Sequence, residues 1–320
     1  MELRTQIPLQ QQEHNQVDYD SKIVLFGSCF TENISKKLHY FKFRNFANPF
    51  GILFQPKAIE KIIVNAINEK VYTEDDIFFY NERWHCFESH SALSDPSKKV
   101  LLKRLNSAIQ STYQQIQSST HIIISLGTSW TYRFIETDTL VANCHKVPQK
   151  KFLKEILSID EIVESLEATI ALIRSINKNT SILFTVSPVR HLKDGFTQNT
   201  QSKAHLIAAV HQVVEPRKNI HYFPSYELLM DELRDYRFYK EDMVHPSQIA
   251  VDYVWKLFST VWVSETAQHT MKEIEVIQKG LSHKPFNPNS EQHLAFLNSL
   301  EQKMETLRKA FPFINFFRIN

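Results

Sequence analysis

The sequence predicts an α/β protein whose central parallel sheet is covered by helices on both faces. Three apolar, β-branched runs at 22–26, 121–127 and 181–186 have the pattern of buried strands. Stretches with helical spacing of apolar residues separate these runs, as they do where helices connect parallel strands. We therefore expect a three-layer α/β/α sandwich with a mostly parallel sheet.

Composition narrows the class of protein. The chain has 320 residues, 42% of them hydrophobic, and a formal net charge of +2 without a strongly basic or acidic half. This balance favours neither nucleic acid nor a membrane surface as partner. The N-terminus lacks a signal-peptide pattern, no apolar stretch is long enough to span a bilayer, and three cysteines are too few for a disulfide framework. We expect a cytoplasmic protein.

The elements follow in order along the chain. A strand, a turn and a helix occupy 22–40, an aromatic stretch at 40–46 is a possible second strand, and helices are expected at 57–69 and 97–118. Between those helices, 77–80 and 83–87 flank Asn81-Glu82 and predict a β-hairpin within an insertion at 71–95. Later helices are expected at 159–176, 201–214, 246–260, 265–280 and 290–310, with a strand at 220–223.

This pattern divides the chain into three parts. Residues 1–20 are polar and form an irregular leader, 21–262 form the α/β domain, and 263–320 form a helical hairpin. The hairpin would pack on the domain or on a second copy of the chain, so a homodimer through these helices is a hypothesis.

Polar side chains follow the end of each predicted strand. Gly27-Ser28-Cys29 follows the first, Gly127-Thr128-Ser129 the central one, and Arg190-His191 comes shortly after the next. The last strand leads toward Asp242 and His245. Since carboxyl ends of parallel strands meet at one edge of a sheet, where ligands of open α/β sheets bind, we expect these side chains to gather there.

The residue types at this edge suit nucleophilic catalysis. A serine needs an imidazole base, and the imidazole needs a partner on its other nitrogen. Asp242-x-x-His245 places a carboxylate and an imidazole on one short loop, so Ser28 is the candidate nucleophile and His245 the base oriented by Asp242. Cys29, which we expect to be a packing residue, is the alternative nucleophile.

A developing oxyanion needs preorganised donors. The backbone N–H groups of Ser28 or Cys29 at the helix start are candidates, and so are Asn48 and Gly51 on the loop after the second strand. Weaker candidates for lining the pocket are His145, with Asn143 close by, and the pair Arg190 and His191. His85, Cys86 and His90 fit no strong zinc spacing, so we expect neither a metal nor a cofactor.

The motif Gly-Ser-Cys-Phe at 27–30 resembles the naming motif of the GSCFA family, with Thr31 at the fifth position in place of Ala. That family is similar to the SGNH (GDSL-like) hydrolases, and the resemblance covers roughly 20–260. It implies a flavodoxin-like sheet, Ser28 as nucleophile, Gly51 as the second-block glycine, and the pair Asp242 and His245 as the last block.

The third block departs from this pattern. The superfamily has Gly-x-Asn-Asp there, whose Asn donates to the oxyanion, but this chain has Gly127-Thr128-Ser129-Trp130. Asn48, Asn143 or Thr128 are candidate replacements. By resemblance we expect an esterase that removes an acetyl or other short acyl group from a carbohydrate-like substrate. An O-acyltransferase, a non-catalytic glycan- or ligand-binding member and a thiol enzyme using Cys29 are the alternatives.

Overall fold

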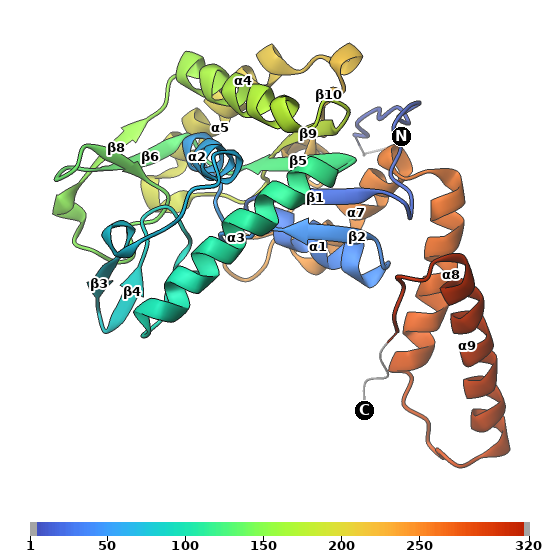
Figure 1. Ribbon diagram of the computed structural model, residues 1–320. Coiled ribbons are helices and arrows are strands. Elements are labelled where there is room, and N and C mark those ends of the chain that lie inside the picture. The colour runs from blue at the N-terminus through green and yellow to red at the C-terminus, as the bar shows by residue number, and fades with distance from the viewer. Residues whose placement is uncertain (1–4, 317–320) are drawn as a thin grey trace.

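A five-stranded parallel sheet forms the centre of the computed structural model, which describes residues 5–316 (Figure 1). Its strand order is β10-β9-β5-β1-β2. Numbered along the chain within this sheet, the order reads 2-1-3-4-5, the flavodoxin-like arrangement. The strands are β1 (Lys22–Gly27), β2 (Arg44–Ala47), β5 (His121–Leu126), β9 (Ser181–Val186) and β10 (Ile220–Tyr222).

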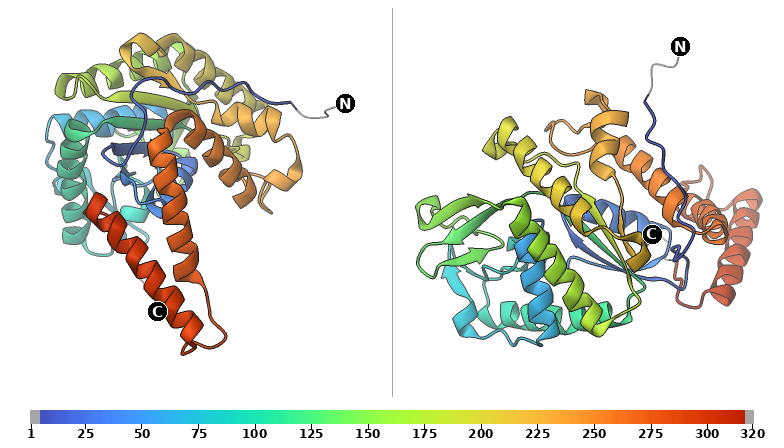
Figure 2. Two further views of the ribbon diagram at one scale, coloured as in Figure 1. Left: turned by 90° about the vertical axis from the view of Figure 1, so that its right-hand side faces the viewer. Right: turned by 90° about the horizontal axis from the view of Figure 1, so that it is seen from above.

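Alternate side chains of these strands enter two separate cores. Val24 and Phe26 of β1 face one side, and Ile23 and Leu25 face the other. The first core is closed by α2 (Pro56–Ile67), α3 (Lys98–Ser118), α4 (Ile159–Ile176) and α5 (Phe196–Val213), the second by α1 (Cys29–Tyr40) and α7 (Gln248–Trp262). Helices thus cover both faces of the sheet, as Figure 2 shows, and the predicted three-layer sandwich is confirmed.

The predicted hairpin is also confirmed. It pairs β3 (Phe78–Tyr80) with β4 (Arg83–His85), and Asn81 and Glu82 turn the chain with positive φ angles of 45° and 61°. Two central residues with φ > 0 define the turn whose twist suits a two-residue hairpin.

A second, antiparallel sheet was not predicted. It contains β6 (Trp130–Phe134), β7 (Thr139–Val141) and β8 (Phe152–Ile156) in the order β7-β6-β8. β6 and β8 mix charged with aromatic residues, and β7 has only three residues, so none of them has the long apolar run that marks a buried strand. Phe87, just after the hairpin, packs on Phe134 and Phe152 and joins the hairpin to this sheet.

Some boundaries differ from the prediction. The second strand begins at Arg44 because α1 continues to Tyr40 and Lys42, at a positive φ of 63°, turns the chain. Helix α5 begins at Phe196, five residues before the predicted start at 201. In the connection after β10, α6 (Ser225–Glu227) runs into a π-helical turn at Leu228–Glu232.

The C-terminal helices α8 (Glu265–Ser282) and α9 (Glu291–Ala310) project from the domain as a pair (Figures 1 and 2). They attach beside the amino ends of β1 and β2, where Tyr19 stacks on Phe43 and contacts Phe311. Gln278 of α8 donates to the carbonyl of Tyr40. Among the described helices, none has both the length and the apolar character that crossing a membrane requires.

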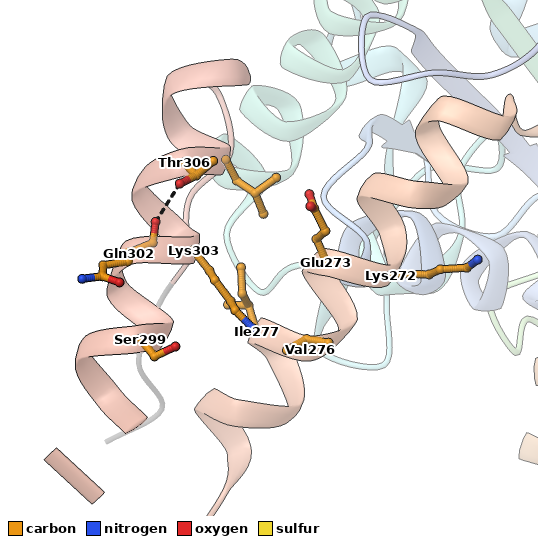
Figure 3. Close-up of a pocket in the computed structure, with 9 residues that line it drawn as sticks. Lys272, Glu273, Val276, Ile277, Ser299, Gln302, Lys303 and Thr306 are labelled. Atoms are coloured by element: carbon orange, nitrogen blue, oxygen red, sulfur yellow. Dashed lines mark hydrogen bonds between the residues drawn. The ribbon is translucent and has the colours of Figure 1, made fainter. Parts of the chain in front are cut away.

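A groove of about 420 Å³ lies between these two helices (Figure 3). Val276 and Ile277 of α8 and Ser299 and Lys303 of α9 are among the residues that line it. The groove belongs to the C-terminal pair and contains none of the predicted site residues. The homodimer through these helices stays a prediction.

Candidate active site

The turn between β1 and α1 holds the candidate nucleophile in a tightly constrained backbone. Gly27 has a φ of +135°, and a Cβ added there would lie 2.1 Å from the carbonyl oxygen of Ser125 on β5. Only glycine fits such a position without moving the backbone. Ser28 then caps α1, with its Oγ accepting from the Phe30 N–H at 3.2 Å.

The Ser28 hydroxyl also pairs with a second serine. Its Oγ lies 2.9 Å from Ser125 Oγ, and its backbone N–H donates to the Ser125 carbonyl at 3.2 Å. β1 and β5 flank the switch point of the sheet, the usual ligand site of this fold. Ser28 is nevertheless only 2% exposed, and within residues 5–316 no hydrogen bond joins it to His245. Ser125 was missed by sequence reasoning, although it is a polar residue within an apolar run.

The predicted Asp242 and His245 pair is formed on a single loop. His245 Nδ1 lies 2.7 Å from Asp242 Oδ2, while Asp242 Oδ1 accepts from the N–H groups of Val244 and His245 at 2.9 Å. These backbone and imidazole donors hold the pKa of Asp242 well below its usual range. With Nδ1 bonded to the carboxylate, Nε2 is the nitrogen left to exchange a proton.

Several contacts bring this loop toward the carboxyl edge of the sheet. The Arg190 N–H, shortly after β9, donates to the Val244 carbonyl at 3.3 Å. The charge of His245 acts on the neighbouring His191, and that of Lys240 acts on the Cys29 thiol. The dyad loop, Lys240–Pro246, therefore lies near the residues that follow both β1 and β9.

Cys29 is half-buried beside Ser28. Burial raises the pKa of its thiol, and the charge of Glu32 adds to this effect, although the thiol's own backbone N–H and Lys240 oppose it. A raised pKa keeps the sulfur protonated, which makes it a weak nucleophile. The Cys29 N–H lies in the first turn of α1, and apart from the thiol of its own residue it has no hydrogen-bond partner among the described residues.

The other proposed oxyanion donors are mostly engaged. Asn48 Oδ1 accepts from the Gly27 N–H at 2.9 Å, and its Nδ2 donates to Glu32 at 2.5 Å. The Gly51 N–H donates to the Asn48 carbonyl at 2.8 Å, and the missing side chain of Gly51 makes room for His90. Asn48 and Gly51 thus shape the turn beside Ser28.

The residues after β5 turn toward α5. Thr128 Oγ1 pairs with Ser202 Oγ at 2.9 Å, and Gly127 donates its N–H to the Phe54 carbonyl at 2.7 Å. The Gly127 carbonyl accepts from Lys203 Nζ at 2.7 Å, and the same ammonium donates to the Ser187 carbonyl at 2.6 Å. Lys203 ties the carboxyl ends of β5 and β9 together.

Lys203 was not predicted as part of the site. It is 1% exposed, and burial lowers its pKa to about 7. His191 packs beside Gly127 and Phe54, and burial, with the charges of Lys203 and His245, lowers its pKa to about 3. His191 is therefore a neutral imidazole near the edge, and its Nε2 is buried without a partner among the described residues.

His145 lies elsewhere. Its Nε2 pairs with the Cys86 carbonyl at 2.7 Å, its ring is 4.7 Å from that of His85, and Asn143 Oδ1 accepts from its N–H. Burial lowers its pKa to about 4. In the part of the chain that the structure describes, no hydrogen bond joins His145 to Ser28 or to the dyad loop, and no cluster of three metal-ligating side chains occurs.

Comparison with protein families assigns the chain. The model of the GSCFA family matches residues 22–258, and a second model, described as the GSCFA domain protein, C-terminal domain, matches 274–318. The first match covers well over half of the chain, so the protein belongs to the GSCFA family. Comparison with curated proteins gives no match.

Proposed function

We propose that this protein is a serine ester hydrolase in which Ser28 is the nucleophile, His245 the general base and Asp242 its orienting partner. The observation that carries the proposal is the preformed pair of Asp242 and His245, at 2.7 Å, beside the edge where Ser28 follows β1. This carboxylate fixes the imidazole tautomer whose Nε2 can take a hydroxyl proton.

The chemistry begins when the Ser28 hydroxyl leaves its bond to Ser125 and turns to the substrate. Ser28 Oγ attacks the ester carbonyl as His245 Nε2 takes the proton. The carbon–oxygen bond to the alcohol then breaks, and the imidazolium returns its proton to that alcohol. Water, deprotonated by His245, attacks the acyl-enzyme, and Ser28 recovers its proton as the acid leaves. A second alcohol in place of water would make the reaction an acyl transfer.

The N–H of Cys29, which donates to no other described residue, is the best-supported donor to the oxyanion. It belongs to the first turn of α1, where the helix dipole also favours negative charge. Asn48 and Thr128 are less suited, since their side chains already have partners. A short acyl group on a carbohydrate is the proposed substrate, an extension from the resemblance to SGNH hydrolases.

The test uses p-nitrophenyl acetate with the wild type, Ser28→Ala and Cys29→Ala at neutral pH, together with a fluorophosphonate probe read by mass spectrometry. We expect Ser28→Ala to abolish turnover and labelling, and Cys29→Ala, which keeps its backbone N–H, to retain both. Loss in Cys29→Ala alone would assign the reaction to the thiol. Absence of turnover and labelling in the wild type would overturn the hydrolase proposal for this acyl class.

A ligand-binding protein without turnover is the second candidate. It is favoured by the 2% exposure of Ser28 and by the two hydrogen bonds that occupy its hydroxyl, one capping α1 and one to Ser125. If the protein only binds a ligand, Ser28→Ala should bind glycan as tightly as the wild type does, and the fluorophosphonate should label neither protein.

A further inference from the structure

A pocket of about 330 Å³ lies next to the dyad loop and is lined by aromatic, apolar and cationic side chains together with the carboxylate of Asp235. Arg190 comes from the segment after β9, while Leu229 and Met230 come from the π-helical turn at Leu228–Glu232. Tyr236 and Tyr239 complete the lining. π-Helical turns occur frequently at functional sites, and this one places two apolar residues against the same space as an arginine.

Arg190 gives this pocket a positive charge that no protein carboxylate neutralises. Its guanidinium lies over the Tyr239 ring, 4.6 Å from the centroid, and its Nη2 donates to the Tyr239 hydroxyl at 2.9 Å. Within residues 5–316, no ion pair reaches Arg190. A guanidinium has five N–H donors, so this arrangement leaves it with donors to spare.

The other charges of the pocket are already paired. Arg234 Nη2 contacts Asp231 Oδ1 at 3.1 Å, and Arg237 holds the Asp235 carboxylate through contacts of 3.1 Å. The Asp235 carboxylate also accepts from the Arg237 N–H. Because these charges cancel, the pocket keeps the surplus positive charge of Arg190.

The pocket and the dyad loop share structure. Tyr239 forms a β-bridge with Pro246, and the N–H of the next residue, Lys240, donates to the His245 carbonyl at 2.8 Å. The Arg190 N–H donates to the Val244 carbonyl from the other side. A ligand in the pocket would therefore touch the two residues whose backbones hold the dyad loop.

We propose that this pocket binds an oxyanionic group, a carboxylate or a phosphate, through the free donors of Arg190. Guanidinium groups recognise both by parallel N–H···O bonds. The tyrosine rings and the apolar turn fit a sugar ring or other carbon skeleton that carries the anion. The binding of an anion here is independent of the function proposed above. The further step, that the anion is part of the ester substrate, rests on that function.

Titration calorimetry at low salt tests the binding, with glucuronate and inorganic phosphate as separate probes. We expect the wild type to bind at least one of them and Arg190→Gln to bind it roughly tenfold more weakly or worse, as loss of a charge-assisted hydrogen bond implies. Arg217→Gln is the matched control, since Arg217 is exposed, lies before β10 outside the pocket, and removes the same charge.

Two further variants keep the result clear if Arg190→Gln misfolds. Tyr236 is 77% exposed, so Tyr236→Ala leaves the core intact while removing one wall, and we expect it to weaken glucuronate binding severalfold. Arg237→Gln releases the Asp235 carboxylate toward the pocket, and we expect it to weaken the binding of either probe.

Binding of phosphate alone, or of glucuronate alone, identifies the anion. Equal binding by wild type and Arg190→Gln, or none by wild type, overturns the proposal.

Whether the bound anion is part of the ester substrate is tested separately. If the hydrolase proposal holds, an acetylated glucuronate should show a lower KM than acetylated glucose, and Arg190→Gln should remove that preference. Anion binding without ester turnover would sink the hydrolase proposal and leave the anion site standing. Turnover without any preference for the acidic sugar would separate the anion site from the ester substrate.

Discussion

The turn after β1 and the dyad loop present their reactive groups in opposite ways. Ser28 is almost fully buried, and its hydroxyl is held by Phe30 and by Ser125, which is 97 residues away in the chain. Asp242 and His245 are partly exposed and hold each other across three residues. The proposed base is thus organised by local contacts and the proposed nucleophile by tertiary contacts, so changes to each should have different consequences.

The largest expected effect is on catalysis at the dyad loop. His245→Ala should lower kcat for p-nitrophenyl acetate on the order of 10³-fold or more, and Asp242→Asn somewhat less, because the first removes the proton acceptor and the second its orientation. Stability by urea unfolding should change little in either variant, since both side chains are solvent-accessible.

The control for this comparison is His269→Ala. His269 is an exposed histidine that also faces an acidic residue on its own element, Glu273. Its substitution should leave kcat unchanged. Equal loss of activity in His269→Ala, or full activity in His245→Ala, would contradict the assigned base.

The second largest effect is expected on stability, at the turn between β1 and α1. Gly27→Ala should lower the free energy of unfolding by about 3 kcal/mol or more, because the added Cβ meets Ser125 backbone at 2.1 Å in a strained φ region. Gly195→Ala also has a positive φ, +104°, but its Cβ would meet only the end of the Gln198 side chain. We expect about 1 kcal/mol there. Similar losses in urea unfolding would show that Gly27 is not specially constrained.

The third expected effect is on the pH dependence of stability. It involves the buried Lys203, which joins the ends of β5 and β9 near both the turn after β1 and the dyad loop. Its folded pKa of about 7 lies below the unfolded value of roughly 10.4, so the unfolded chain binds more protons between these values. The stability of the wild type relative to Lys203→Met should therefore rise from pH 7 to pH 10, by at most about 1.4 kcal/mol per pH unit. A flat or falling difference in urea unfolding would mean that Lys203 is charged when buried.

The smallest effect is expected at the hydrogen bond between the two serines. Ser125→Ala should destabilise the protein by about 1 kcal/mol, because one buried hydroxyl pair is lost. It should also raise the rate of fluorophosphonate labelling at Ser28, whose hydroxyl loses a competing partner. Ser187→Ala removes another buried serine hydroxyl after a neighbouring strand and serves as the control for labelling. Slower labelling in Ser125→Ala would indicate that Ser125 positions the nucleophile instead.

Much of this framework could be predicted from local patterns. Apolar runs identified β1, β5 and β9, the spacing Asp242-x-x-His245 identified the dyad, and Asn81-Glu82 identified the hairpin turn. Each of these predictions rests on a pattern of residues close in sequence. The second sheet was missed because β6 and β8 have mixed polar and aromatic sequences, β7 has only three residues, and their pairing forms only in three dimensions.

The sequence by itself determined the α/β class, the place of Ser28 at the end of a strand and the pairing of Asp242 with His245, because periodicity and short spacings are local properties. Only the tertiary structure decided that Ser125 holds the Ser28 hydroxyl, that Lys203 joins the ends of β5 and β9, and that Arg190 lines a pocket without a carboxylate paired to it. These contacts join distant residues, and parallel strands acquire such neighbours only when the connecting helices have packed.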